Sequence, residues 1–99
     1  MKLVFTREAK RDLDELRAYL QPLSPKGLAN VVQSIELRIT TGLANPRIGR
    51  PTPREDVREL VESKYGFLIP YYVKRNKFYV LRVYSARRKP LDYDALTLP

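Results

Sequence analysis

The chain of 99 residues contains no cysteine, no histidine and no tryptophan. Without cysteine no disulfide can form, and without cysteine or histidine the thiolate and imidazole ligands of most metal sites are missing. The Ser-His and Cys-His arrangements that activate a nucleophile are excluded for the same reason. Any acid–base chemistry must therefore come from Asp, Glu, Tyr, Lys or Arg, and we expect neither a metal nor another cofactor.

Long apolar runs are missing as well. No segment approaches the roughly 18 consecutive apolar residues of a membrane span, and the opening MKLVFTRE is too short and too soon charged for a signal peptide. The four glycines form neither a phosphate-binding loop nor a dinucleotide fingerprint. At this length we expect one basic globular domain in the cytoplasm, with no membrane partner.

Positive charge is in excess and unevenly distributed. Nineteen Lys and Arg residues stand against 11 Asp and Glu, a formal net charge of +8. Residues 63–91 contain eight basic residues and no acidic one, whereas charges in the rest of the chain cancel. Such a segment predicts a positive surface that attracts a polyanion or an acidic protein. The simpler alternative is a soluble basic protein whose charge serves no partner.

Two amphipathic helices joined by a short connector are predicted in the first half of the chain. Thr6 is a suitable N-cap for the first helix, whose apolar positions recur at helical spacing: Ala9, Leu13, Leu16 and Leu20. Ser24, followed by Pro25, is a suitable N-cap for the second, with the apolar stripe Leu28, Val31 or Val32, Ile35, Ile39 and Leu43. The short connector predicts an antiparallel helical hairpin.

The apolar period changes to two after the loop of residues 45–56. Strands are predicted at residues 57–62, 67–74 and 78–84, joined by links of hairpin length, and a short strand at residues 2–5. The order β-α-α-β-β-β predicts an α+β domain in which the helical hairpin packs on one face of a small antiparallel sheet. The tail, residues 91–99, has no period, and its candidate docking residues are Leu91, Tyr93, Leu96 and Leu98.

The last predicted strand indicates a candidate binding surface. Tyr79, Leu81 and Val83 share one face, which we expect to pack against the helices. Arg82 and Tyr84 would then lie on the open face, beside the basic run of residues 87–89, and would suit phosphate and base contacts. The alternative is structural: Tyr84 is a half-buried sheet aromatic, and Arg82 is the solvated cross-strand partner of Glu59 or Glu62.

Arg58 leaves a similar choice open. As a strand residue next to Glu59 it could lie near the surface of Arg82 and Tyr84, but a strand arginine beside acidic residues is more often part of an ion pair. A phenol such as that of Tyr84 would act as a base only if neighbouring cations lowered its pKa.

Four segments in this order resemble the RelE/ParE superfamily of bacterial toxins: residues 4–13 (VFTREAKRDL), 45–51 (NPRIGRP), 58–60 (REL) and 79–90 (YVLRVYSARRKP). The resemblance implies a single toxin domain over residues 1–90, with residues 91–99 as a C-terminal tail. It also implies a type II toxin–antitoxin system. The expected partner is then a cognate acidic antitoxin, whose C-terminal segment wraps the toxin in a hetero-oligomer.

The superfamily has two activities, and the loop and closing motif resemble its ParE branch more closely. The ParE-like interpretation implies inhibition of DNA gyrase, alone or with its DNA, and hence of replication, without catalytic residues. Its candidate target-binding residues are Arg50, Arg82, Tyr84, Arg87, Arg88 and Lys89. The RelE-like alternative is a metal-free mRNA endonuclease on the ribosome that uses Arg58, Arg82 and Tyr84. A third alternative is a non-toxic homologue that only binds the antitoxin.

Overall fold

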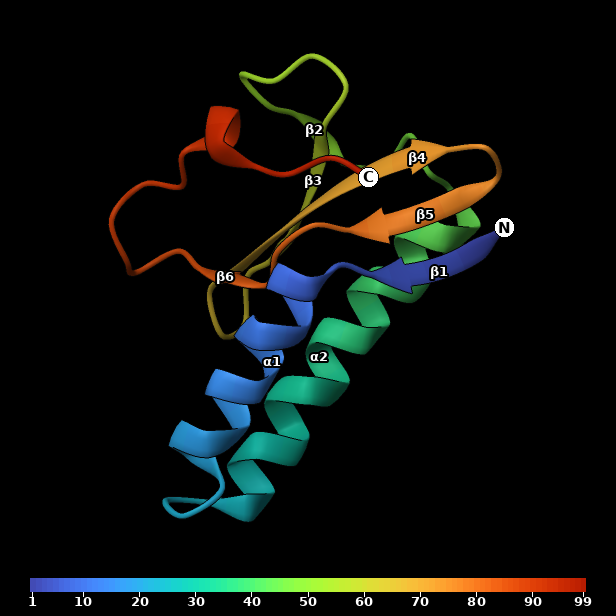
Figure 1. Ribbon diagram of the computed structural model, residues 1–99. Helices are drawn as coiled ribbons and strands as arrows, with labels where there is room; N and C mark the ends of the chain where they lie inside the picture. The colour runs from blue at the N-terminus through green and yellow to red at the C-terminus, as the bar shows by residue number, and fades with distance from the viewer.

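The helices and strands follow the predicted order, with three additional short elements. The computed structural model describes residues 1–99, in which a helical hairpin lies against one face of a sheet and the C-terminal tail runs along the other (Figure 1). The elements are β1 Lys2–Phe5, α1 Arg7–Leu20, α2 Pro25–Ala44, β2 Arg50–Pro51, β3 Arg58–Glu62, β4 Phe67–Lys74, β5 Lys77–Val80, β6 Tyr84–Ser85 and the 3-10 helix η1 Tyr93–Ala95. Neither α-helix is long and apolar enough to cross a membrane.

Both helices begin at the predicted capping residues. The Thr6 hydroxyl accepts a hydrogen bond from the Ala9 N–H at 3.2 Å, and the Ser24 hydroxyl accepts one from the Gly27 N–H at 2.9 Å. Each cap satisfies one of the N–H groups that a helix start leaves unpaired. The buried face of α2 comprises Leu28, Val31, Ile35, Ile39 and Gly42, which confirms the predicted stripe.

The sheet has the strand order β1-β5-β4-β3-β2, and β6 pairs with β4 beyond the end of β5. The α+β class with a helical hairpin on one face is confirmed. The sheet is mixed rather than wholly antiparallel, because β1 pairs with β5 in parallel. A parallel pair needs a long crossover between its strands, and the hairpin together with β2, β3 and β4 provides it.

The two faces of β5 are assigned differently from the prediction. Phe78 and Val80 pack in the core beneath the helices, whereas Tyr79 and Leu81 belong to a second apolar cluster on the other face. Tyr79, Leu81 and Val83 were predicted to face the helices, and of these three only Val83 does. Both faces of β5 are covered, so the alternation of apolar residues carries no information about which one the helices cover.

The second face is covered by the C-terminal tail, as its apolar residues indicated. Val57, Leu81 and Leu96 are buried there, and a set of partly buried residues packs around them: Tyr72, Tyr79, Leu91, Tyr93 and Leu98. The Arg54 guanidinium donates to the carbonyl oxygens of Tyr93 and Leu96. The tail is therefore tied to the fold by polar as well as apolar contacts.

Tyr71 anchors the loop after α2 to the core. Its ring stacks on Phe78 with a centroid distance of 4.4 Å, and its hydroxyl donates to the Pro46 carbonyl at 2.6 Å and accepts from the Gly49 N–H at 3.0 Å. A Cβ on Gly49 would lie 2.5 Å from the Tyr71 ring, so only glycine fits there. Burial raises the pKa of the Tyr71 phenol, which keeps this donor protonated.

We expect Tyr71→Phe to lower the free energy of unfolding by about 1–3 kcal/mol, because it leaves the buried Gly49 N–H and the Pro46 carbonyl without their partner. Urea unfolding followed by circular dichroism measures the change. The control is Tyr19→Phe, at a residue that is 69% exposed, where a change within about 0.5 kcal/mol is expected. Equal losses in both variants would contradict this role of Tyr71.

Candidate functional site

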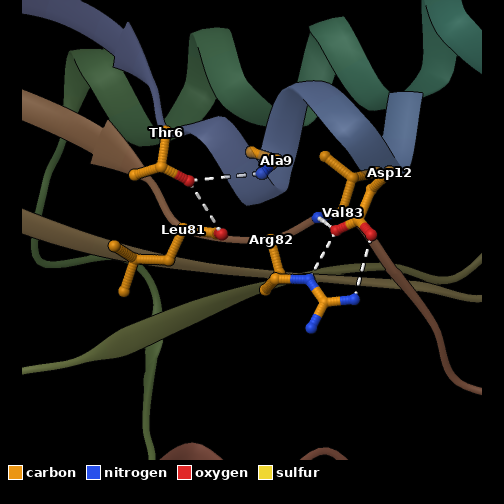
Figure 2. A network of polar contacts seen from close by, with 6 residues as sticks. All are labelled: Thr6, Ala9, Asp12, Leu81, Arg82 and Val83. Atoms are coloured by element: carbon orange, nitrogen blue, oxygen red, sulfur yellow. Dashed lines mark hydrogen bonds and ion pairs between the residues drawn. The ribbon is translucent and has the colours of Figure 1, made fainter. Parts of the chain in front are cut away.

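Arg82 forms a two-pronged ion pair with Asp12 of α1. Its Nε lies 2.6 Å from Asp12 Oδ2 and its Nη2 lies 2.9 Å from Oδ1, while the backbone N–H of Val83 donates to the same Oδ2 at 2.9 Å (Figure 2). The Asp12 side chain is 7% exposed and that of Arg82 is 25% exposed. The prediction that Arg82 pairs with Glu59 or Glu62 is therefore wrong, because the partner comes from a helix and not from a neighbouring strand.

The pair lies where the chain leaves the sheet between β5 and β6. Nearby, Thr6 links the start of α1 to the same segment, since its hydroxyl donates to the Leu81 carbonyl at 3.0 Å (Figure 2). The hydrogen bonds that Arg82 donates to the Asp12 carboxylate raise the pKa of Arg82, so this guanidinium stays charged. With Nε and Nη2 bound to Asp12, only Nη1 is left without a hydrogen-bond partner.

Tyr84 lies beneath two guanidinium groups. The Arg82 and Arg88 Cζ atoms are 5.2 and 5.3 Å from its ring centroid, which is cation–π distance. Tyr84 is buried, with 5% exposure, and its hydroxyl donates to the Lys89 carbonyl at 2.6 Å. An open cavity of about 210 Å³ lies against Arg82, Tyr84, Arg88 and Lys89 and is lined on its other side by the tail. These four predicted residues are thus brought together.

The other candidate residues lie elsewhere. Arg50, on β2, binds the buried Glu59 carboxylate at 2.6 Å. Arg58 donates to the Gly49 carbonyl at 2.9 Å and makes no ion pair, so the expected pairing with an acidic neighbour is wrong. In register Arg58 lies opposite Tyr71, on the helix side, whereas Tyr84 lies opposite Leu68, on the other face. Arg58, Arg82 and Tyr84 therefore do not form one catalytic cluster.

A larger groove of about 640 Å³ runs between the helical hairpin and the end of the sheet near β6. Its apolar floor includes Leu16, Leu20, Val31, Tyr65 and Phe67, and its walls carry charges of opposite sign: Asp12 and Glu15 on α1, Arg87 and Arg88 after β6. The groove exists because the far ends of both helices project beyond the sheet (Figure 1). The family resemblance implied apolar grooves of the helical hairpin and sheet that an antitoxin covers, but the residue pattern assigned Leu16 and Leu20 to the core, because helical spacing does not reveal where the sheet ends.

The basic segment of residues 63–91 does not form one positive surface. Arg82 and residues 87–89 lie at the β6 end of the sheet, whereas Lys74, Arg75 and Lys77 lie at the β4–β5 turn, at the opposite end (Figure 1). The strands run between the two ends, so residues close in sequence are separated in space. No group of three or more acidic side chains that could hold a metal ion occurs in the chain.

Comparisons with known proteins agree on one family. The family described as "ParE toxin of type II toxin-antitoxin system, parDE" matches residues 3–90. A protein of Sinorhizobium fredii, named "Putative toxin Y4kP", is 33% identical over 75 residues, which are 76% of this chain and 78% of that protein. A solved structure described as "Chromosomal ParDE TA system from P. aeruginosa" is similar with a TM-score of 0.74 and 30% identity, over 88% of this chain and 97% of the other.

We expect the Asp12–Arg82 pair to show a coupling free energy of about 1–3 kcal/mol in a double-mutant cycle of Asp12→Asn and Arg82→Met, because the two side chains are in contact and largely buried. Urea unfolding of the four proteins measures it. The pair Asp14–Arg17, at 4.0 Å with both side chains more than half exposed, is the matched control. Its coupling should stay below about 0.5 kcal/mol, and the same value for both pairs would refute the assignment.

Burial, together with the hydrogen bond to the Glu59 carboxylate, raises the pKa of Tyr93 from 10.0 to about 12. The folded state thus holds this proton more tightly than the unfolded chain. The contribution of the protonated Tyr93 hydroxyl to the free energy of unfolding is complete below pH 10 and is lost as the pH rises towards 12. The stability advantage of the wild type over Tyr93→Phe should shrink across this range, measured by urea unfolding at stepped pH. A constant difference between pH 8 and pH 12 would contradict the prediction.

Proposed function

Since this chain belongs to the ParE toxin family of type II toxin–antitoxin systems, we propose that it inhibits DNA gyrase, and so replication, in the cytoplasm and that a cognate antitoxin neutralises it. The observation that carries the proposal is the cluster around Tyr84. It gathers three positive side chains, those of Arg82, Arg88 and Lys89, beside one cavity. Its one hydroxyl, that of Tyr84, already donates to the Lys89 carbonyl. Such a cluster is suited to binding and not to cleavage.

The geometry argues against the RelE-like alternative. Cleavage of RNA without a metal needs a base within reach of the attacking hydroxyl. The Tyr84 hydroxyl is bound to the Lys89 carbonyl, Arg82 is held by Asp12, and Arg58 lies on the other face of the sheet. Inhibition by binding requires none of these groups to transfer a proton.

The residues of the cluster, together with the adjoining Arg87, divide into contacts and supports. Arg87, Arg88 and Lys89 are exposed, and we assign the target contacts to them. Tyr84 supports these contacts from beneath, since its ring lies under the Arg88 guanidinium and its hydroxyl donates to the Lys89 carbonyl. Arg82 supports Tyr84 in turn, since its guanidinium lies over the same ring. Arg50 lies on the β2 edge and is paired with Glu59, so we assign it to fastening the tail and not to the target.

The groove between the hairpin and the sheet suits the antitoxin. An amphipathic segment can place its apolar face on Leu16, Leu20 and Phe67. An acidic segment, in addition, would meet Arg87 and Arg88 at the groove wall. The likeness to a structure described as a ParDE system supports a hetero-oligomer of this kind.

The test compares three forms of the purified protein in a gyrase supercoiling assay. We expect Arg88→Gln with Lys89→Gln to raise the concentration for half-inhibition about tenfold or more, because two positive contacts are lost. The control, Lys10→Gln with Lys26→Gln, removes the same charge from exposed positions on the helices and should leave inhibition unchanged.

The alternatives give different results. Expression alone should arrest bacterial growth with filamentation and a DNA-damage response, and co-expression of the antitoxin should relieve it. Cleaved mRNA in a ribosome-dependent assay, with normal supercoiling, would support the RelE-like alternative and overturn the proposal. Growth without any arrest, and a purified protein inactive in both assays, would support a non-toxic homologue that only binds the antitoxin.

A further inference from the structure

Three lysines form a continuous row across the sheet at the end away from the Tyr84 cluster. In register Lys2 of β1 lies opposite Lys77 of β5, and Lys77 lies opposite Lys74 of β4. Their neighbours in the strands, Leu3 and Phe78, belong to the helix-side core. Because side chains alternate along a strand, the three lysines all project from the face opposite the helices.

This lysine row has no internal counter-charge. None of the three ion pairs in the chain includes Lys2, Lys74 or Lys77, and none of their side chains donates a hydrogen bond within the protein. Arg75, in the turn, adds further positive charge, and so does the amino terminus, whose neighbour Lys2 donates its N–H to Asn76. Like charges directly opposite each other destabilise a sheet. A bound anion would relieve this repulsion between the three lysines.

The backbone positions of the row are fixed by the turn and the strand pairing. Arg75 and Asn76 both adopt the left-handed conformation, with φ of 50° and 61°, which is the geometry of the tight turns that match strand twist. Lys74 and Lys77 flank this two-residue turn and pair with each other. The strand pairing therefore sets the spacing of their Cα atoms before a ligand binds.

A row of tyrosines lies next to the lysines on the same face. Tyr72 lies opposite Tyr79, and Tyr79 lies opposite Val4. Each of these residues is two positions along its strand from a lysine of the row. The two rings have a centroid distance of 6.4 Å and remain partly exposed, although the tail packs against them. The lysine row and the tyrosine row are about 7 Å apart along the strands. Positive side chains beside aromatic faces are the combination that binds single-stranded nucleic acid.

We propose that the row of Lys2, Lys77 and Lys74, with the adjoining Tyr72 and Tyr79, binds single-stranded DNA. The phosphates would lie along the lysines and one or two bases would stack on the tyrosine rings. A duplex would use the lysines only, because its base faces are paired and stacked. The choice of DNA rests on the proposed function, whose target works on DNA; the surface itself is separate from the Tyr84 cluster.

Fluorescence anisotropy with a labelled oligothymidylate of about 15 nucleotides tests this without gyrase. With three phosphate contacts the affinity should fall about 20-fold between 50 and 200 mM salt. Lys74→Gln with Lys77→Gln should weaken binding about tenfold or more at low salt and flatten the salt dependence. The control, Lys10→Gln with Lys26→Gln, changes the net charge equally, at exposed positions on the helices, and should bind as the wild type does.

Further probes separate the contributions of phosphate and base. An abasic strand of the same length keeps the phosphates, and loss of one stacked base should weaken its binding about fivefold or more. Equal binding of the abasic strand, preference for duplex or for oligouridylate, or equal loss in both lysine variants would overturn the proposal. The variant Lys74→Gln with Lys77→Gln that still inhibits gyrase but loses the oligonucleotide supports two separate surfaces. If the wild-type protein binds the oligonucleotide but does not inhibit gyrase, that result counts only against the proposed function.

Discussion

The carboxylate of Asp12 joins α1 to the segment between β5 and β6, and the basic end of the sheet depends on this joint. It receives two hydrogen bonds from Arg82 and one from the Val83 backbone. These contacts fix α1 against the segment between β5 and β6, where the strand pairing of β5 with β4 ends. The position of β6, and of the basic residues that follow it, depends on this joint. Buried and bidentate, the pair is of the kind that specifies geometry more than it adds stability.

A second constraint is that both faces of the sheet are covered. The helices bury Ile69, Tyr71 and Phe78, whereas the tail buries Leu81 on the other face. Glu59, 2% exposed, lies under the tail and binds both Arg50 and the Tyr93 hydroxyl. A short chain that covers both faces gains apolar burial, which small domains otherwise lack. The cost is that a charged group has to be buried and fully paired.

The positive charge is divided between the two ends of the sheet, and the division separates two kinds of surface. At the β6 end, guanidinium groups surround a buried tyrosine beside the groove that we assign to the antitoxin. Arg88 lines both the groove and the Tyr84 cavity, so an antitoxin in the groove would touch a residue that we assign to the target. At the other end the lysine row has no internal partner. The basic segment of residues 63–91, joined by Lys2, thus supplies two separate surfaces.

Local features of this protein could be predicted from its sequence: the caps at Thr6 and Ser24, the buried stripe of α2, the strand periods, the docking of the tail and the membership of the toxin family. Each of these features depends on residues close together in the chain or on short motifs that follow one another in a fixed order. The tertiary structure alone decided which face of β5 meets the helices, that Arg82 pairs with Asp12 some 70 residues away, that Arg58 and Tyr84 lie on opposite faces, and that the basic segment is divided. These depend on register and on the two layers that cover the sheet, because an alternating strand with apolar residues on both faces fits either orientation equally well.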